Sequence, residues 1–496
     1  MGKFSRRSLL VGAGVVGGAL ATRYLTNETI SFGTRYPTPA NDPLVLNDAS
    51  LLSPVKVSKH LTLEENPGDA LVDALRKELA EAKSERRPFV ASAARHSMGG
   101  QSLATNATAV TMDQEWLEAD TQNGVYRVAA GTRWSTIIKR LDEIGFSPKV
   151  MQSNNDFGVA STFCVNAHGW PVPFSAAGST VKSFRMMRHD GEMIQCSRNE
   201  NADQFNLAMG GYGLSGIITD LDVEMVPNAR LVPTFEQFPG PEFGTRFVEK
   251  LASDKTIQMA YGRLDVTIDG FFDEALMITY TPTDDQSDLP AASGSGFLSN
   301  ASREIFRRQV GSDRVKSWRW FTETSIGPNV GGGSETTRNS LINEPVITLD
   351  DGDPNRTDIL HEYFVSPDRF AEFVDACKDI IPSSYQELLN ITLRFVDTDN
   401  ESVLSYATEP RIAAVMLFSQ EMSVRGEADM QRMTSALIER VLEIGGTYYL
   451  PYRLHATNGQ FLRGYERAKE FAALKRRADP ELVFTNMMWD RYMAHL

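Results

Sequence analysis

The stretch Ala93-Ala94-Arg95-His96-Ser97-Met98-Gly99-Gly100-Gln101-Ser102 directly follows a short apolar run, residues 88–91, which predicts a buried strand. Six of the ten residues in this stretch are Gly, Ala or Ser. Small residues after a strand allow backbone N–H groups to come close to a pyrophosphate. An ordinary turn is the alternative, but a turn seldom needs Arg-His-Ser followed by Gly-Gly-Gln-Ser. The stretch therefore predicts a loop that holds a pyrophosphate.

Helical and strand-like patterns surround this loop. Apolar residues recur at three- and four-residue steps over residues 71–82, which predicts a helix that Asp69 can cap. Residues 125–144 predict a strand followed by a second amphipathic helix. From Val159 to Val226 the sequence predicts short strands that alternate with small-residue turns. This pattern stops at Pro227-Asn228, where we expect a domain boundary.

Two later stretches are also rich in small residues. The first ends in His-Gly and reads Val159-Ala160-Ser161-Thr162-Phe163-Cys164-Val165-Asn166-Ala167-His168-Gly169. The second leads into an apolar strand and reads Gly211-Tyr212-Gly213-Leu214-Ser215-Gly216-Ile217-Ile218. With the first loop, and in the same order, they resemble the flavin-contacting elements of the vanillyl-alcohol-oxidase/PCMH-type FAD-binding family, nearest to aldonolactone and polyol oxidases and to cytokinin dehydrogenases. Asp479-Pro480 and Phe484-Thr485-Asn486 are similar to the ending of aldonolactone-oxidase-like members.

This resemblance implies that the cofactor is FAD. The first loop of the family commonly reads Gly-x-Gly-His-Ser, whereas Ala93 and Arg95 stand at the glycine positions here. Arg95 can alter the approach of the loop to the phosphates. The residues that the resemblance assigns to the cofactor are Ala93, Ala94, Arg95, His96, Ser97, Gly99, Gln101, Ser102, Ser161, Thr162, Asn166, His168, Gly169, Gly211, Gly216, Ile217, Ile218 and Asn486.

Relatives with a histidine at the place of His96 use it as a covalent tether to the flavin, so the resemblance implies that His96 is a tether. A histidine that only contacts the pyrophosphate is the alternative. An unperturbed imidazole is largely neutral near pH 7 and can act as the nucleophile. A second, cysteinyl link is not expected, because Cys164 sits closer to His168 than the doubly tethered relatives place their cysteine. For His168 itself we expect a structural or flavin-packing role.

Candidate catalytic residues follow later in the chain. Strand alternation places Asn390, Thr392 and Arg394 on one face, and related polyol oxidases carry Glu-x-Arg at what corresponds to Thr392 and Arg394. In those enzymes the arginine stabilises negative charge, while Thr392 puts a polyol substrate in doubt. Tyr452 and His455 lie where such oxidases have a basic residue, and both can take a proton from a hydroxyl.

A further candidate for the pocket wall lies in the cap strand 362–365. Its Tyr363 can line the pocket or pack in the core, and core packing is the expected role.

The resemblance implies an α+β fold, in which a PCMH-type FAD-binding domain of two subdomains carries a mixed sheet-and-helix cap. We expect residues 50–228 to form the FAD-binding domain, residues 229–440 to form the substrate-binding cap and residues 441–496 to complete the flavin site. Residues 1–21 resemble a twin-arginine export signal, with Arg6-Arg7 before a short apolar run. Residues 22–49 then read as a linker.

The function implied by the resemblance is oxidation of a CH–OH group in a sugar, lactone or other alcohol, with hydride transfer to FAD. Two alternatives stay open, namely CH–NH oxidation as in cytokinin dehydrogenases and an electron-transfer subunit without a substrate of its own. The electron acceptor is either dioxygen or an unknown carrier. The export signal predicts a periplasmic protein, and because its apolar run is too short for a comfortable span, no stable membrane insertion is expected unless the signal stays uncleaved.

Composition argues against other classes of function. The chain has 496 residues, which suits two or three domains, and a net charge of −14, which disfavours binding to nucleic acid. Its three cysteines are widely spaced and suggest neither a disulfide framework nor a zinc site. The seven histidines show no metal-ligand spacing either. The sequence therefore predicts an organic cofactor and no metal.

Overall fold

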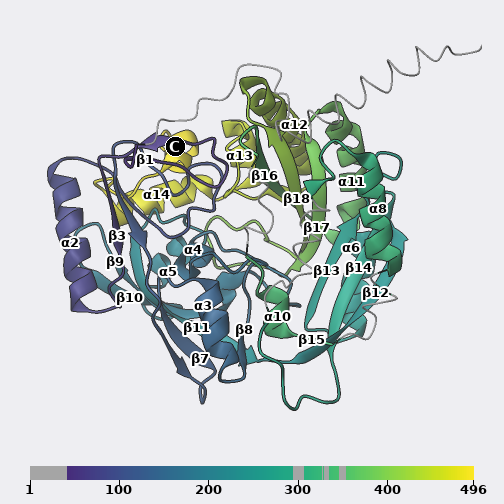
Figure 1. The fold of residues 1–496 in the computed structure, drawn as a ribbon. Coiled ribbons are helices and arrows are strands. Elements are labelled where there is room, and N and C mark those ends of the chain that lie inside the picture. The colour runs from purple at the N-terminus through teal and green to yellow at the C-terminus, as the bar shows by residue number, and fades with distance from the viewer. Residues whose placement is uncertain (1–41, 294–306, 327, 329–334, 346–352) are drawn as a thin grey trace, which may run out of the picture.

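The computed structural model describes residues 42–293, 307–326, 328, 335–345 and 353–496. The predicted export signal and most of the predicted linker lie outside these residues. The described chain forms a two-stranded sheet (β1, Val45–Leu46, and β2, Val55–Lys56), a three-stranded sheet, a six-stranded sheet and an eight-stranded sheet, with helices packed around them (Figure 1). The fold is α+β, as the sequence predicted.

The first part of the FAD-binding region is a small parallel sheet with the order β3-β5-β4. Its strands are β3 (Lys59–Leu63), β4 (Phe89–Ser92) and β5 (Thr108–Met112). Helix α2 (Asp69–Ser84) connects β3 to β4 and buries Leu71, Leu75 and Leu79, because these residues lie one helical turn apart. The loop that begins at Ala93 leaves the carboxyl end of β4.

The second part is an antiparallel sheet with the order β10-β9-β11-β7-β6, and β8 also pairs with β11. Its strands are β6 (Leu117–Asp120), β7 (Val125–Ala129), β8 (Phe146–Pro148), β9 (Val181–Met187), β10 (Met193–Ser197) and β11 (Ile217–Pro227). Helix α3 (Trp134–Asp142) packs Trp134, Ile137 and Ile138 into the same core cluster as the residues of this sheet. A turn at Asp190-Gly191 connects β9 to β10.

Two details of the prediction are wrong. Residues between Val159 and Val226 include the helices α4 (Val159–Cys164) and α5 (Ala202–Ala208) as well as strands. Residues such as Val159 favour strands locally, but burial of the α4 side chains outweighs that preference. Asp69 does not cap α2; it is the first helical residue, and the N-cap is Gly68 without a side-chain hydrogen bond.

The cap is built on the eight-stranded sheet, whose order is β15-β12-β14-β13-β17-β18-β16-β19. Its strands are β12 (Arg230–Pro239), β13 (Met259–Leu264), β14 (Glu274–Pro282), β15 (Thr336–Thr337), β16 (Arg356–Val365), β17 (Glu387–Val396), β18 (Arg411–Glu421) and β19 (Thr447–Tyr448). Every pairing in this sheet is antiparallel.

Helices cover the outer face of the cap sheet. They are α6 (Phe243–Ser253), α11 (Phe370–Ile380) and α12 (Val424–Glu443), and their apolar residues share one core cluster with the strands (Figure 1). The shorter α8 (Asp313–Phe321) and α10 (Arg338–Ile342) lie in the same part of the chain. The other face of the sheet is turned toward the FAD-binding region.

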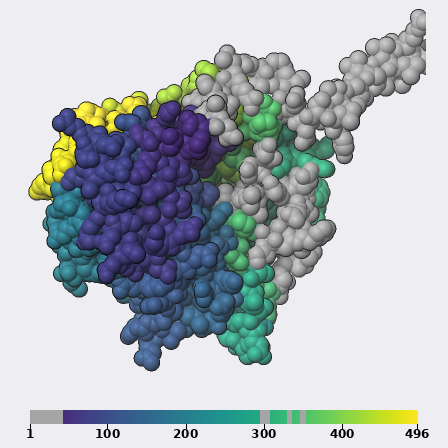
Figure 2. Space-filling model, turned by 60° about the vertical axis from the view of Figure 1, so that its left-hand side comes forward, coloured from purple at the N-terminus to yellow at the C-terminus, as the bar shows by residue number. Residues whose placement is uncertain are grey.

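The C-terminal segment returns from the cap to the FAD-binding region. After β19 it forms α13 (Asn458–Gly464), α14 (Ala468–Ala478) and α15 (Met487–Tyr492). In Figures 1 and 2 these yellow helices lie beside the purple N-terminal part of the FAD-binding region. The C-terminal segment therefore lies next to the N-terminal part of the FAD-binding region, although the two are far apart in sequence.

Within the described ranges, no helix has the length and apolar character that a membrane crossing requires. In the same ranges, no group of three or more His, Cys, Asp or Glu side chains could hold a metal ion.

Candidate active site

A cavity of about 580 Å³ lies between the FAD-binding region and the cap sheet. Both halves of the chain and the C-terminal segment contribute to its wall. The predicted site residues that line it are Ala93, Ala94, Arg95, His96, Ser97, Gln101, Ser102, Ser161, Thr162, His168, Gly216, Ile217, Ile218, Arg394 and Tyr452. The predicted residues that do not line it are Gly99, Asn166, Gly169, Gly211, His455 and Asn486.

The first loop, Ala93 to Ser102, has the backbone geometry of an anion cradle. Arg95 adopts a left-handed conformation, with φ of 52°. Such a conformation favours glycine, which is the residue that the family carries there. The Arg95 side chain donates from Nη1 to Thr111 Oγ1 at 2.9 Å. Within the described part of the chain, the backbone N–H groups from Ala94 to Ser97 make no hydrogen bond to another residue, so they can donate to a bound phosphate.

Three other predicted residues hold this loop in place, and two of them, Gly99 and Asn486, do not line the cavity. A Cβ added at Gly99 would lie 2.5 Å from the carbonyl oxygen of Tyr452, so only glycine allows the two segments to approach. Gln101 Nε2 donates to the same carbonyl at 2.9 Å. Asn486 Nδ2 donates to the carbonyl oxygens of Gln101 and Tyr212, at 2.8 and 3.1 Å. Asn486 is therefore a positioning residue that joins the first and third elements.

The second element enters the cavity through helix α4. A Cβ added at Gly158, just before the helix, would lie 2.5 Å from Cβ of Ala93, so the first and second elements touch. Ser161 and Thr162 line the cavity, and Thr162 Oγ1 accepts a hydrogen bond of 2.8 Å from Trp134 Nε1. The hydroxyl of Thr162 is thus fixed by the protein itself.

Three residues that were predicted to contact the cofactor lie against other parts of the protein and do not line the cavity. A Cβ at Gly169 would lie 1.9 Å from the carbonyl oxygen of Met151, and one at Gly211 would lie 2.1 Å from that of Leu207. Asn166 binds Gly178 N and Asp399 Oδ2, both at 2.9 Å. Glycine is therefore required at 169 and 211 because the backbone of another residue lies close to each of them.

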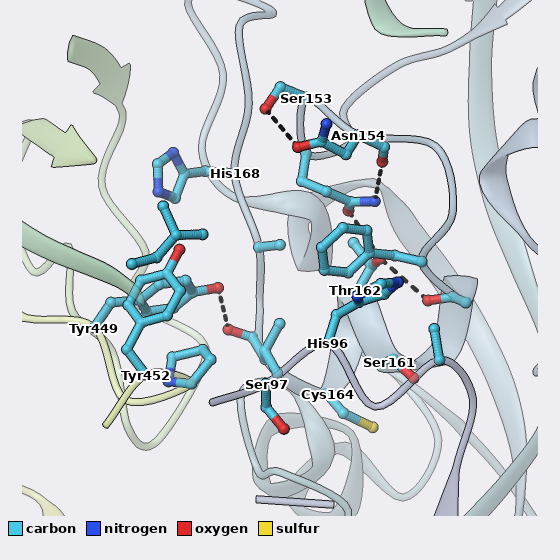
Figure 3. Close-up of a pocket in the computed structure, with 18 of the residues that line it drawn as sticks. His96, Ser97, Ser153, Asn154, Ser161, Thr162, Cys164, His168, Tyr449 and Tyr452 are labelled. Carbon is cyan, nitrogen blue, oxygen red and sulfur yellow. Dashed lines mark hydrogen bonds between the residues drawn. The ribbon is translucent and has the colours of Figure 1, made fainter. Parts of the chain in front are cut away.

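On the cap side, four polar side chains meet at the cavity wall. Figure 3 shows His168 and Tyr452 on one side of the cavity, across from His96, Ser161 and Thr162. Tyr452 donates its hydroxyl proton to Glu362 Oε2 at 3.2 Å, and the other oxygen of Glu362 binds His168 Nε2. Arg394 donates from Nη1 to the carbonyl oxygen of His168 at 3.2 Å. These four residues form a continuous polar network, which we call the Glu362 network.

Burial shapes the electrostatics of the Glu362 network. Burial, and then the nearby Glu362 carboxylate, raise the pKa of the Tyr452 phenol well above its ordinary value, while Arg394 opposes them. Burial lowers the pKa of the Arg394 guanidinium, and Glu362 opposes that effect. Arginine keeps its charge in proteins even so. The wall therefore presents a fixed positive charge beside a protonated phenol that already donates to a carboxylate.

His455, which was predicted as a candidate base, does not line this cavity. Its side chain is 5% exposed, and both ring nitrogens have partners inside the protein. Nδ1 binds Thr434 Oγ1 at 2.7 Å and Nε2 binds Glu427 Oε1 at 3.0 Å. Arg453 Nη2 also binds Glu427, so the chain after Tyr452 turns its polar side chains toward α12 and away from the cavity.

His96 lies at the opposite wall, in the first loop. Its ring packs beside Phe157, with a centroid separation of 4.5 Å. Burial and, to a lesser extent, Arg133 lower the pKa of the imidazole, while Asp156 opposes them. The neutral form of His96 is therefore favoured at neutral pH. Cys164 also lines the cavity, but burial raises the pKa of its thiol to about 12, which makes it a poor nucleophile.

The residues present fit FAD. The first loop offers free backbone N–H groups at one end of the cavity, and Gly216, Ile217 and Ile218 provide an apolar wall along it. A volume of about 580 Å³ lies in the range of small-molecule and cofactor sites. The same cavity reaches the cap, which leaves a compartment beside the FAD-binding region for a second ligand.

Several residues of the cavity wall were missed by the sequence reasoning. Glu362 lies in the predicted cap strand 362–365, where Tyr363 was the predicted candidate for the pocket. Tyr363 is 1% exposed and packs against Phe373 in the core, the role expected for it, while Glu362 faces the cavity. Arg263 also lines the cavity and carried no local motif that could have identified it.

Comparison with known proteins agrees with this geometry. Residues 70–197 match the family described as FAD binding domain. The chain is 25% identical over 158 residues to a putative D-arabinono-1,4-lactone oxidase of Neurospora crassa, a match that covers 32% of this chain and 28% of that protein. It is 22% identical over 282 residues to the mitochondrial L-galactono-1,4-lactone dehydrogenase of Brassica oleracea, covering 56% of this chain and 45% of that protein.

A cytokinin dehydrogenase gives a similar match. Cytokinin dehydrogenase 9 of Oryza sativa subsp. japonica is 26% identical over 144 residues, which cover 28% of this chain and 27% of that enzyme. In each of these comparisons the chain spans less than half the length of the relative. The matched profile over residues 70–197 and the fold agree, and together they show that the chain contains an FAD-binding domain.

Proposed function

We propose that this protein is an FAD-dependent oxidoreductase that oxidises a CH–OH group of a small substrate held between the FAD-binding domain and the cap. The observation that carries the proposal is the Glu362 network, which lines the same cavity as the flavin loops. Such a network can remove a hydroxyl proton and stabilise the oxygen that loses it. Bound FAD would supply the two-electron acceptor for the hydride from the carbon.

The residues of the network have distinct roles in this reaction. Tyr452 donates to Glu362, so a lone pair of its phenol oxygen can accept the hydroxyl proton of the substrate while its own proton passes to Glu362. His168 holds the other oxygen of Glu362 and so fixes the carboxylate. Arg394, which is 8% exposed, provides positive charge for the developing alkoxide in a site shielded from water.

A flavin screen under anaerobic conditions tests this proposal. Alcohols, lactones, sugars and amines are mixed with the purified holoprotein, and loss of the visible flavin absorption reports reduction. Bleaching by an alcohol, with a carbonyl product, supports CH–OH oxidation. Bleaching by amines alone favours the CH–NH alternative, for which the Glu362 carboxylate in the cavity is the supporting observation. Bleaching by none of them favours an electron-transfer subunit. Reoxidation in air separates dioxygen from another carrier as the acceptor.

We also propose that His96 is joined covalently to the flavin. Three observations support this: His96 lines the cavity, its loop carries the His-Ser pair of the family, and burial keeps its imidazole neutral. A tether suits the export that residues 5–21 suggest, because an exported enzyme cannot readily recapture lost FAD. We propose a periplasmic location for the protein on that same ground.

A further inference from the structure

The cap end of the cavity carries an arginine that no carboxylate of the described chain neutralises. Arg263 on β13 pairs in register with Thr392 on β17, and its Nη1 donates to Thr392 Oγ1. Arg394 follows two residues after Thr392 on the same face of β17. Arg263, Thr392 and Arg394 all line the cavity.

Two of the three acidic residues that line the cavity have other partners, and the third, Glu344, forms no ion pair with Arg263 among the described residues. Glu362 binds His168 and Tyr452, and Glu323, which also lines the cavity, binds Arg319 Nε at 2.7 Å. Among the described residues, Arg263 forms no ion pair and its remaining guanidinium donors bind no protein atom. Two like charges at diagonal positions of one sheet face repel each other, and an anion between them would relieve that repulsion.

The electrostatic influence of Arg263 is visible on both neighbouring arginines. Behind the dominant effect of burial, the charge of Arg263 contributes to lowering the pKa of Arg394 and of Arg319. A bound anion would be held by the same uncompensated charge.

Arg263 also lies beside aromatic rings and near further hydrogen-bond donors. Its guanidinium lies 5.3 Å from the centre of the Tyr261 ring, which stacks on Trp170 with a centroid separation of 4.5 Å. Trp170 lines the cavity, and its buried Nε1 donates to no described residue. The buried Nε of Arg394 likewise has no partner among them. This donor-rich surrounding matches the two acceptor oxygens of a carboxylate.

We propose that the cap end of the cavity binds the carboxylate of the substrate through Arg263, and that the substrate class is therefore a hydroxy acid. This inference rests on the proposed alcohol oxidation, because it assigns a second group of the same substrate. Arg263 holds the carboxylate, while the hydroxyl of the substrate faces Tyr452 and Arg394. Thr392 is part of the selection, since a carboxylate side chain at that position would neutralise Arg263.

Paired ligands test the inference. Lactate is compared with 1,2-propanediol, and gluconate with glucitol, so that each pair differs by a carboxylate in place of CH₂OH. Binding to the holoprotein is followed by the change in the flavin spectrum, or by the concentration dependence of bleaching where the ligand is oxidised. We expect at least one acid to bind more tightly than its neutral partner. In Arg263→Gln its dissociation constant should rise about 10- to 100-fold, as for loss of a hydrogen bond to a charged group.

Three variants serve as controls. Thr392→Glu should weaken acid binding by pairing with Arg263, whereas the uncharged Thr392→Gln should weaken it much less. Arg246→Gln removes an equal charge from the outside of α6, where the side chain is 48% exposed, and should leave the binding of both ligands unaffected.

The inference is overturned if neither acid binds more tightly than its neutral partner, or if Arg263→Gln affects both members of a pair equally. Oxidation of neutral alcohols alone would overturn it and leave the proposed function standing. Tight, Arg263-dependent acid binding without any flavin bleaching would support the carboxylate site and contradict the proposed oxidation.

Discussion

The hydroxyl of Tyr452 donates to Oε2 of Glu362 across 3.2 Å and so joins the C-terminal segment to strand β16 of the cap sheet. The two residues are 90 positions apart in sequence. The contact depends on β19, which pairs with β16 at Tyr363↔Tyr448 and sets the direction of the chain that follows. The proposed proton path therefore exists only when the cap and the C-terminal segment are assembled.

Tyr452→Phe and Glu362→Gln are predicted to slow flavin reduction by the substrate about 10²- to 10⁴-fold, the usual cost of losing a positioned acid–base group. Tyr452→Phe removes the atom that receives the proton, and Glu362→Gln removes the group to which it passes. Rapid mixing under anaerobic conditions measures the rate.

His455→Ala is the matched control, because His455 lies outside the cavity. It should lower the free energy of unfolding by about 1–3 kcal/mol, since buried hydrogen bonds are lost. The rate of flavin reduction should stay near that of the unaltered protein. Normal reduction in both Tyr452→Phe and Glu362→Gln would refute the assignment.

Local sequence patterns were sufficient to predict part of the cavity wall on the side of the FAD-binding region. The residues from Ala93 to Ser97 and from Gly216 to Ile218 are contiguous, and each set lines the cavity as a unit. Gly99, Gly169 and Gly211 show the limit of such patterns. A glycine required for close approach to a cofactor looks identical in sequence to one required for close approach to another part of the protein.

The cap side could not be predicted in the same way. Glu362 and Tyr363 are 3% and 1% exposed, so both faces of β16 are buried. The alternation that normally separates an inner from an outer face is then absent, and nothing local shows which residue faces the cavity. Arg263 reaches Thr392 only through the pairing of β13 with β17, a contact between residues 129 positions apart.

Covalent attachment of FAD predicts that flavin colour and fluorescence stay with the protein pellet after acid precipitation. In His96→Ala the flavin should move to the supernatant, because the nucleophile is gone. Cys164→Ala is the control and should retain the flavin in the pellet, since the raised pKa of that thiol makes it unreactive. Free FAD released from the unaltered protein would exclude the tether without affecting the fold or the cavity.

Export is predicted to depend on the paired arginines before the apolar run at the N-terminus. Arg6→Lys together with Arg7→Lys keeps the charge but removes the arginine pair, so flavin-loaded protein should accumulate in the cytoplasm. Cell fractionation followed by flavin fluorescence measures the distribution. Unchanged export of the double variant would show that another route or another segment directs the protein.

Stability is predicted to fall below about pH 6.5 because His361 is buried and its Nε2 has no hydrogen-bond partner among the described residues. Burial, with help from the charges of His455 and Arg453, lowers the pKa of His361 well below its ordinary value of 6.5, while Glu427 opposes that effect. The unfolded chain therefore binds a proton that the folded protein excludes, and each such group costs about 1.4 kcal/mol per pH unit on acidification. His455, whose pKa burial also lowers, acts in the same direction. Urea unfolding below pH 6.5 measures the free energy of unfolding at each pH. We expect this free energy to depend less steeply on pH in His361→Asn than in the unaltered protein. The control His495→Asn changes an exposed histidine and should behave like the unaltered protein.

Lys475 and Asp479 form an ion pair in which both side chains are 0% exposed, and we predict that breaking it is costly. Asp479 also accepts hydrogen bonds from the backbone N–H groups of Val483 and Phe484, at 3.1 and 2.8 Å, and Phe484 lines the cavity. Lys475→Met would leave a buried carboxylate without its partner and should lower the free energy of unfolding by about 3–5 kcal/mol. Because the turn before Phe484 loosens, the flavin content of the purified variant should fall as well.

The double variant Lys475→Met/Asp479→Asn separates the charge from the turn. It removes both buried charges, and the amide oxygen of Asn can still accept one of the two backbone hydrogen bonds, which go to different oxygens of Asp479. We therefore expect it to recover part of the stability and flavin content lost in Lys475→Met, because the desolvation penalty of the unpaired carboxylate disappears. Urea unfolding of the four proteins in the double-mutant cycle measures the coupling between the two positions. Equal and additive losses in the two single variants would mean that the ion pair contributes little, and that the turn is held by the backbone hydrogen bonds alone.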